Sequence, residues 1–150
     1  MSTDVYERLR TAGNDEGSAV YLEQPISPAE WEACLQRGRA ELGWEGLEWY
    51  RDFLETSNGV QIDNAIFESA EGLIEANLDY RASTQAQPRF VLFGNSGNLD
   101  AYLLDREATY GPFLVANFYG DFSRDEEILE RYPSLEALLT TLLDREAGVV

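Results

Sequence analysis

The segment from residue 90 to residue 118 constrains the fold of this chain most, because it holds three closely spaced apolar runs. Phe90–Phe93 and Ala101–Leu104 flank the loop Gly94–Asn98, which is rich in glycine and asparagine. Two apolar runs around such a loop predict an antiparallel hairpin. The third run, Phe113–Phe118, predicts a strand that is buried on both faces. Short strands are also predicted for three β-rich segments: Ala19–Leu22, Val60–Ile62 and Ala65–Phe67.

The first half of the chain carries two helix patterns. Apolar spacing predicts a short helix over Asp4–Ala12. Ser27 and Glu30 have the spacing of a capping box, with Pro28 at the first helical position, where its missing N–H costs nothing. This second helix is predicted to run to about Glu41.

The second half carries three more helix starts. Ser69 is placed to cap one helix, and Ser134 is placed to cap a last helix, Leu135–Arg145, with a leucine stripe. A second capping box, Ser123–Glu126, predicts a short helix through Ile128 and Leu129. With 150 residues, the chain fits one domain. The predicted fold is α+β, with a mainly antiparallel central sheet packed against N-terminal and C-terminal helices.

The stretch Leu42–Gly59 combines a helix pattern with a stop signal. Helical spacing from about Gly46 gives the stretch an apolar side, formed by Leu47, Tyr50, Phe53 and Leu54. The opposite side is acidic and consists of Glu45, Glu48, Asp52 and Glu55. Asn58–Gly59 is predicted to be the C-cap, because glycine adopts the left-handed conformation without penalty.

The residue composition excludes most catalytic chemistry. The chain has no histidine, its 11 basic residues are all arginine, and its one cysteine, Cys34, falls on the apolar side of a predicted helix. Serine and cysteine triads, histidine-ligated zinc and lysine Schiff bases are thereby removed. Carboxylate chemistry stays open, because 28 acids always place some pair close together. We expect no enzyme and no cofactor or metal.

The net charge of the chain indicates which classes of partner it can bind. A formal net charge of −17 repels nucleic acid and anionic lipid and attracts cationic proteins. No apolar run is long enough to span a membrane, and the N-terminus lacks the pattern of a secretory signal. We therefore expect a soluble, cytoplasmic protein that binds neither nucleic acid nor membrane.

The acids are most concentrated between Glu41 and Glu75, where nine carboxylates accompany one arginine, Arg51. The simplest interpretation is the solvated side of an amphipathic helix. The functional interpretation is a surface for arginine and lysine side chains of a partner, with Trp44 as an aromatic anchor. For Trp44 itself, half-buried structure is favoured over a role in binding. Its candidate residues are Trp44, Glu45, Glu48, Asp52, Glu55, Asp63 and Glu68.

The order of these short motifs resembles the SMI1/KNR4 family, also called the SUKH superfamily. The resemblance covers about residues 21 to 144 and rests on the motifs Ser27-Pro28-x-Glu30, Glu41-Leu42-Gly43, Phe53-Leu54-x-x-x-Asn58-Gly59, Phe90-x-x-Phe93-Gly94-x-x-Gly97 and Ala101-Tyr102-x-x-Asp105. The family pattern usually has Leu-Pro at the start of the helix after the Leu-Gly, where this chain has Gly46-Leu47. The resemblance supplies no catalytic residue. Asn58, Gly59, Gly94 and Gly97, together with Asp105, match positions that we interpret as structural turns or supports.

The resemblance implies an α+β domain and a binding function. Many bacterial members look like immunity proteins, which bind and neutralise a cognate toxin that is often a nuclease. Some eukaryotic members look like regulatory scaffolds for signalling or cell-wall proteins. We expect an immunity protein for a cationic toxin domain, with the regulatory scaffold as the alternative.

Overall fold

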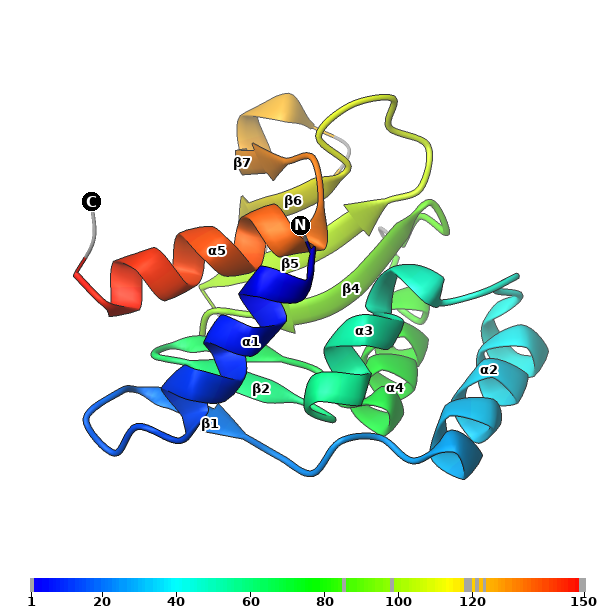
Figure 1. Cartoon of the computed structure of the whole chain (residues 1–150). Coiled ribbons are helices and arrows are strands. Elements are labelled where there is room, and N and C mark those ends of the chain that lie inside the picture. The colour runs from blue at the N-terminus through cyan, green and yellow to red at the C-terminus, as the bar shows by residue number, and fades with distance from the viewer. Residues whose placement is uncertain are drawn as a thin grey trace.

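The computed structural model describes residues 2–84, 86–97, 99–117, 120, 122 and 124–148. Its centre is a seven-stranded sheet in which the strands lie in chain order and each neighbouring pair is antiparallel (Figure 1). The strands are β1 (Val20–Leu22), β2 (Val60–Ile62), β3 (Ala65–Phe67), β4 (Phe90–Asn95), β5 (Asp100–Asp105), β6 (Phe113–Asn117) and β7 (Ile128–Tyr132). The predicted α+β class with a mainly antiparallel sheet is confirmed.

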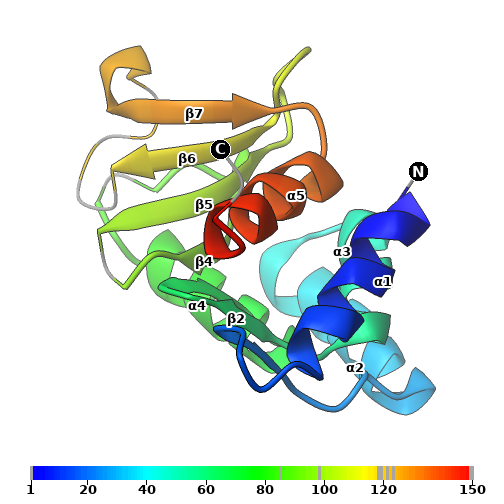
Figure 2. The same cartoon turned by 60° about the vertical axis from the view of Figure 1, so that its left-hand side comes forward.

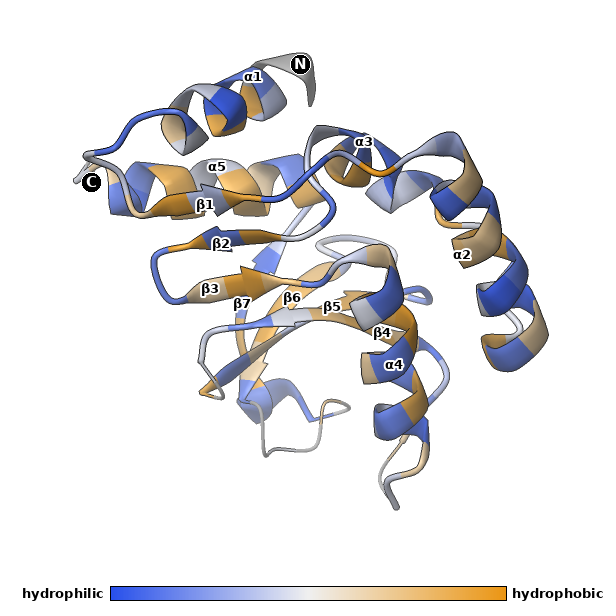
Figure 3. Ribbon diagram, turned by 90° about the horizontal axis from the view of Figure 1, so that it is seen from below, coloured by the Kyte–Doolittle hydropathy of each residue, from blue (hydrophilic) through white to orange (hydrophobic). Residues whose placement is uncertain are grey.

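Five α-helices surround this sheet in the described part of the chain. They are α1 (Ser2–Gly13), α2 (Pro28–Leu42), α3 (Glu48–Thr56), α4 (Ala70–Arg81) and α5 (Leu135–Glu146). Figure 3 shows α1 and α5 together over one face of the sheet. Because α3 directly precedes β2 and α4 directly follows β3, both helices lie at the same end of the β2–β3 hairpin. Helix α2 packs against α4 beside them.

The predicted helix starts at three serines are confirmed. The Ser27 hydroxyl accepts from the Glu30 amide at 3.1 Å, and the Glu30 carboxylate accepts from the Ser27 amide at 3.0 Å, which completes the capping box of α2. Ser69 and Ser134 cap α4 and α5 through their hydroxyls. Each such cap contributes about 1 kcal/mol to helix stability.

An aromatic cluster fixes α3 onto the sheet. Tyr50, Phe53 and Leu54 are fully buried, as the apolar spacing predicts. The Tyr50 and Phe53 rings stack with centroids 4.7 Å apart, and Phe53 meets Phe67 of β3 at 5.7 Å. The Tyr50 hydroxyl also donates to the backbone oxygen of Glu68 at 2.6 Å. Helix α3 is thus fixed by its aromatic contacts and by the hydrogen bond of the Tyr50 hydroxyl.

The predicted hairpin and third strand are also confirmed. β4 pairs with β5 and β5 with β6, and Leu103 and Leu114 belong to a second apolar cluster on the face away from the α3 aromatics. Phe122 packs against this cluster, with its ring 5.9 Å from that of Phe90. β6 is therefore buried on both faces along Phe113–Ala116. Asn98 of the predicted loop and Phe118 of the predicted strand lie outside the described residues.

The predicted helix through Ile128 and Leu129 is wrong. Residues Asp125–Glu127 form one 3₁₀ turn without a side-chain cap, and Ile128–Tyr132 form β7. Ser123 of the predicted capping box lies outside the described residues. The burial of β7 alternates between half-buried and exposed residues, the period of a strand. Pairing with the edge of β6 satisfies backbone groups that a short isolated helix would leave to water.

The turn residues need two corrections. Helix α3 ends with an extended Ser57 as its C-cap, so Asn58–Gly59 is not a left-handed C-cap. Gly59 still needs its freedom, with φ of 103°, and the Asn58 side chain accepts from the Ala70 amide at the start of α4. Gly94 lies inside β4 at a register shift and not in the loop. A Cβ there would lie 2.6 Å from the Ile66 backbone oxygen. Gly97, with φ of 67°, is the true turn glycine.

Candidate functional site

The exposed side of α3 presents three carboxylates around one guanidinium. Glu48, Asp52 and Glu55 are all exposed, as the helical spacing predicts. Arg51 lies among them, with Nη1 3.7 Å from Glu48 Oε1 and Nε 3.3 Å from Glu55 Oε2. Its guanidinium also stands 5.4 Å from the centroid of the Trp31 ring on α2. Asp52 is exposed and has no ion pair with a described residue.

The start of α3 lies later than predicted. The helix begins at Glu48, and Leu47 occupies the cap position without a side-chain hydrogen bond. Glu48 lies in the first turn, where a carboxylate is stabilised by the positive end of the helix dipole. Glu45 therefore precedes the helix instead of extending its acidic side, although it remains exposed next to it.

Trp44 does not lie on the surface, so the interpretation of this residue as structure fits the observed burial and its alternative role as an aromatic anchor does not. Its side chain is 3% exposed and packs near Gly38 of α2. The indole Nε1 has no hydrogen-bond partner within the described structure. A binding partner cannot reach this ring in the observed conformation, so the residue belongs to the core.

The other two predicted carboxylates lie at opposite ends of the β2–β3 hairpin. Asp63 lies in the turn between these strands, with φ of 53°, at the end away from α3. Glu68 follows β3 at the end near α3 and is half-buried. Burial raises the pKa of Glu68, and no described cation pairs with it. The predicted acidic surface is therefore one contiguous helix face with Glu45 beside it, while Asp63 is separate.

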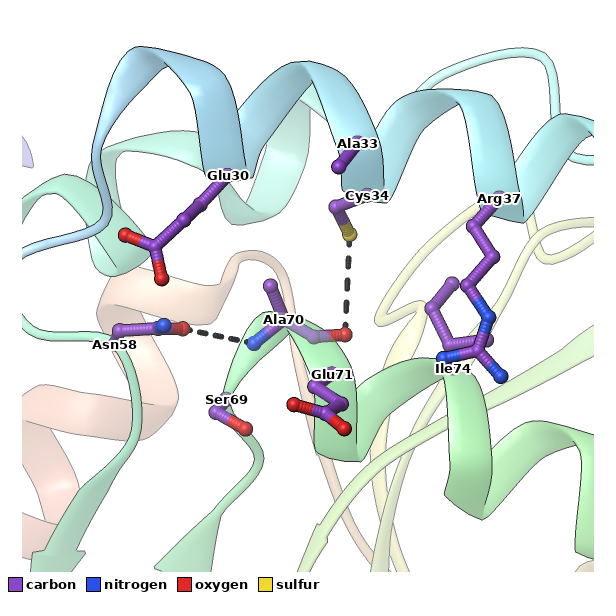
Figure 4. A pocket seen from close by; sticks show the side chains of 9 residues that line it. All are labelled: Glu30, Ala33, Cys34, Arg37, Asn58, Ser69, Ala70, Glu71 and Ile74. Atoms are coloured by element: carbon purple, nitrogen blue, oxygen red, sulfur yellow. Dashed lines mark hydrogen bonds between the residues drawn. The ribbon is translucent and has the colours of Figure 1, made fainter.

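A pocket between α2 and α4 was missed by sequence reasoning. It has a volume of about 270 Å³ and is lined by Glu30, Ala33, Cys34, Arg37, Asn58, Ser69, Ala70, Glu71 and Ile74 (Figure 4). Its walls come from α2 and from the segment around the start of α4, which are far apart in the sequence, so no local motif predicts the pocket. Glu30 and Glu71 are exposed at its rim, and Arg37 is held by Glu41 at 2.5 Å and Glu75 at 2.6 Å.

Cys34 on the wall of this pocket is a structural residue. It is 5% exposed, and its thiol lies 3.8 Å from the Ala70 backbone oxygen. Burial raises the pKa of the thiol, which opposes formation of the nucleophilic thiolate. This agrees with the prediction that Cys34 is a core residue.

Asp105 differs from the acids on α3 because it is buried and forms an ion pair with Arg89. Its two carboxylate oxygens accept from Arg89 Nε at 2.9 Å and Nη2 at 2.8 Å. Burial acts to raise the pKa of Asp105, but the hydrogen bonds from Arg89 and from the Glu107 amide act against it and set the pKa below its usual value. This pair ties the start of β4 to the end of β5.

Further findings concern metal ligands, membrane helices and similarity to known proteins. Among the described residues, no group of three or more histidine, cysteine, aspartate or glutamate side chains is placed to hold a metal ion. No described helix has the length and apolar character needed to cross a membrane. In comparisons with known proteins, neither a protein-family model nor a curated protein matches this chain.

Proposed function

We propose that this chain is a non-enzymatic binding protein, a bacterial immunity protein that neutralises a cognate toxin by direct contact with its acidic surface. The observation that carries the proposal is the exposed side of α3, where Glu48, Asp52 and Glu55 project from a helix whose other side is fixed in the core. The net charge of −17 and the resemblance to the SMI1/KNR4 family support it.

The physical basis of the proposal is charge complementarity. Nucleases and other toxins that act on anionic substrates present positive faces, and an acidic surface can occupy such a face. Complementary charge raises the association rate and makes it fall with added salt. A rigid helix also spares the partner the cost of ordering the carboxylates on binding.

The proposed partner is therefore a cationic toxin domain, not a nucleic acid or a membrane. Neutralisation before the toxin reaches its target places the protein in the cytoplasm of the producing cell. The acidic surface then acts by covering the cationic groups that the toxin needs for its own substrate.

Co-expression rescue tests this proposal. Cells would express basic toxin domains encoded beside the gene for this chain, with and without the chain, and survival would be counted. Rescue by the wild-type chain is expected, with loss of rescue for the variant Glu48→Lys, Asp52→Lys and Glu55→Lys. A matched control reverses three exposed acids outside α3, namely Glu16, Asp79 and Glu107, and should still rescue. The proposal is contradicted if the chain rescues cells from none of the neighbouring toxins.

A further inference from the structure

The two edge strands of the sheet differ in length and in what packs against them. β1 has three residues, and its flanking backbone groups are bonded to side chains. On the side that faces β2, the Ala19 amide donates to the Glu146 carboxylate at 3.1 Å and the Glu23 amide donates to the Ser57 hydroxyl at 2.7 Å. On the outer side, the Val20 amide donates to the Ser18 hydroxyl at 3.4 Å. Helix α1 packs against β1 as well. This edge is short and lies next to α1.

β7 is longer and open. Its five residues pair with β6 on one side, and no described strand pairs with the other side; Figure 2 shows it as the outermost strand. Five residues of strand span about 17 Å. Such an edge presents unpaired backbone N–H and C=O groups to any extended chain that approaches.

Exposed apolar side chains accompany this open edge. Leu129 is 54% exposed and Tyr110 is 77% exposed. A register shift leaves Leu129 without a partner residue on β6. Together with Asp125, Ile128, Glu130 and Arg131, these two residues line a shallow hollow of about 410 Å³ along β7. The hollow offers side-chain contacts next to the free backbone.

The charged residues of β7 are held by their own chain. Charged side chains commonly protect edge strands from pairing. Here Glu130 lies 3.2 Å from Arg145 of α5, and Arg131 lies 3.5 Å from Asp125. These two side chains form ion pairs within the chain, so they are less available to block an approaching strand than the sequence implies.

The charge around β7 selects the kind of segment that can pair with it. From Arg124 to Tyr132 there are four acids and two arginines, a net charge of −2. A second copy of the chain would bring another charge of −17 to the same edge. An extended segment of basic and apolar residues meets both the acids and the exposed Leu129 and Tyr110.

We propose that the outer edge of β7 binds an extended, positively charged segment of the partner protein as an eighth strand of the sheet. This inference rests on the proposed function, because it assigns a second contact to the same cationic partner. Main-chain hydrogen bonds supply affinity in such strand addition, and alternate side chains supply specificity. The basic side chains face Asp125 and its acidic neighbours, and the apolar ones cover Leu129 and Tyr110.

A designed peptide tests the proposal without the natural partner. The probe is the capped peptide Arg-Val-Arg-Val-Arg-Val-Arg, and its controls are the same peptide with N-methylated valines and the analogue with glutamate in place of arginine. Binding is followed by fluorescence anisotropy and by amide hydrogen exchange of the intact protein. We expect at least tenfold slower exchange within Ile128–Tyr132, and at least tenfold weaker binding of both control peptides.

Matched variants locate the binding edge. Leu129→Arg, which replaces an apolar contact by a charge that repels the basic peptide, should weaken peptide binding at least tenfold. Tyr21→Arg, at a residue that is 59% exposed on the other edge strand, β1, should leave it unchanged. Peptide binding without protection of β7, equal binding of the N-methylated peptide, or protection of β7 that rises with protein concentration alone each overturns the proposal.

The last outcome would assign the edge to a second copy of the chain. The proposed function is judged separately by rescue. If Leu129→Arg still rescues cells while reversal of the α3 charges does not, β7 is excluded and the acidic α3 surface stands.

Discussion

The two sides of α3 differ in what they contribute to the protein. The inner side, with Tyr50, Phe53 and Leu54, is fully buried in the aromatic cluster of the sheet. The outer side, with Glu48 and Asp52, lies in solvent. Burial of a large side chain stabilises a fold by kilocalories, whereas an exposed charge changes stability by a few tenths. This nine-residue helix thus carries its apolar contacts on one side and its carboxylates on the other, and we expect substitutions on the acidic side to preserve the fold.

The largest effect is expected on the inner side. Phe53→Ala should reduce the free energy of unfolding by about 3 to 5 kcal/mol, because it leaves a cavity against Phe67 and Tyr50. Urea unfolding followed by circular dichroism measures this change. A loss below about 1 kcal/mol would mean that α3 is not held by this cluster.

The second prediction concerns Asp105, a buried carboxylate at the end of β5. Asp105→Asn should cost about 2 kcal/mol, because it breaks the charge-assisted pair with Arg89. The folded pKa of Asp105 is lowered, so its contribution is present above the unfolded pKa and is lost as the pH falls through the folded pKa. The difference between wild type and variant in urea unfolding should therefore shrink below about pH 4. Glu107→Gln, at an exposed neighbour, is the control and should change little.

Glu68, which is half-buried after β3, tests a pKa shift of the opposite sign. Its folded pKa is raised by burial, so its favourable contribution is present below the unfolded pKa and is lost as the pH rises through the folded pKa. Glu68→Gln should stabilise the protein at pH 7 by less than about 1 kcal/mol, and the gain should disappear toward pH 4. Thermal unfolding at both pH values measures it. If the exposed control Glu71→Gln gives the same gain, burial of Glu68 is not the cause.

The smallest effect on stability is expected on the outer side. The neutral variant Glu48→Gln, Asp52→Asn and Glu55→Gln should change the free energy of unfolding by no more than about 0.5 kcal/mol, because its two ion pairs with Arg51 are exposed. Chemical denaturation measures the change. A loss of several kcal/mol would show that the acidic side is structural and would remove the contrast between the two sides of α3.

The features predicted correctly from sequence are those that depend on residues close together in the chain. The serine caps at Ser27, Ser69 and Ser134, and the apolar side of α3, depend on residues within one or two turns of helix. They were confirmed because capping and helical periodicity act within that range. The acidic face of α3 was predicted for the same reason.

The errors arose where distant residues decide the structure. β7 forms because β6 offers a strand edge, and the sequence near Ile128 does not reveal that edge. Gly94 is needed because the Ile66 backbone and the Tyr102 ring approach it across the sheet. Trp44 is buried because α2 leaves room at Gly38 for its ring. The pocket between α2 and α4 likewise requires the packing of two helices.

The salt dependence of toxin binding tests the central claim most directly. The affinity of the wild-type chain for a toxin that it neutralises would be compared with that of the variant Glu48→Lys, Asp52→Lys and Glu55→Lys at low and high salt. We predict binding that is at least about 100-fold weaker for the variant at low salt, with a flatter dependence on salt. Unchanged affinity in a variant that keeps its fold would contradict the role of the α3 surface.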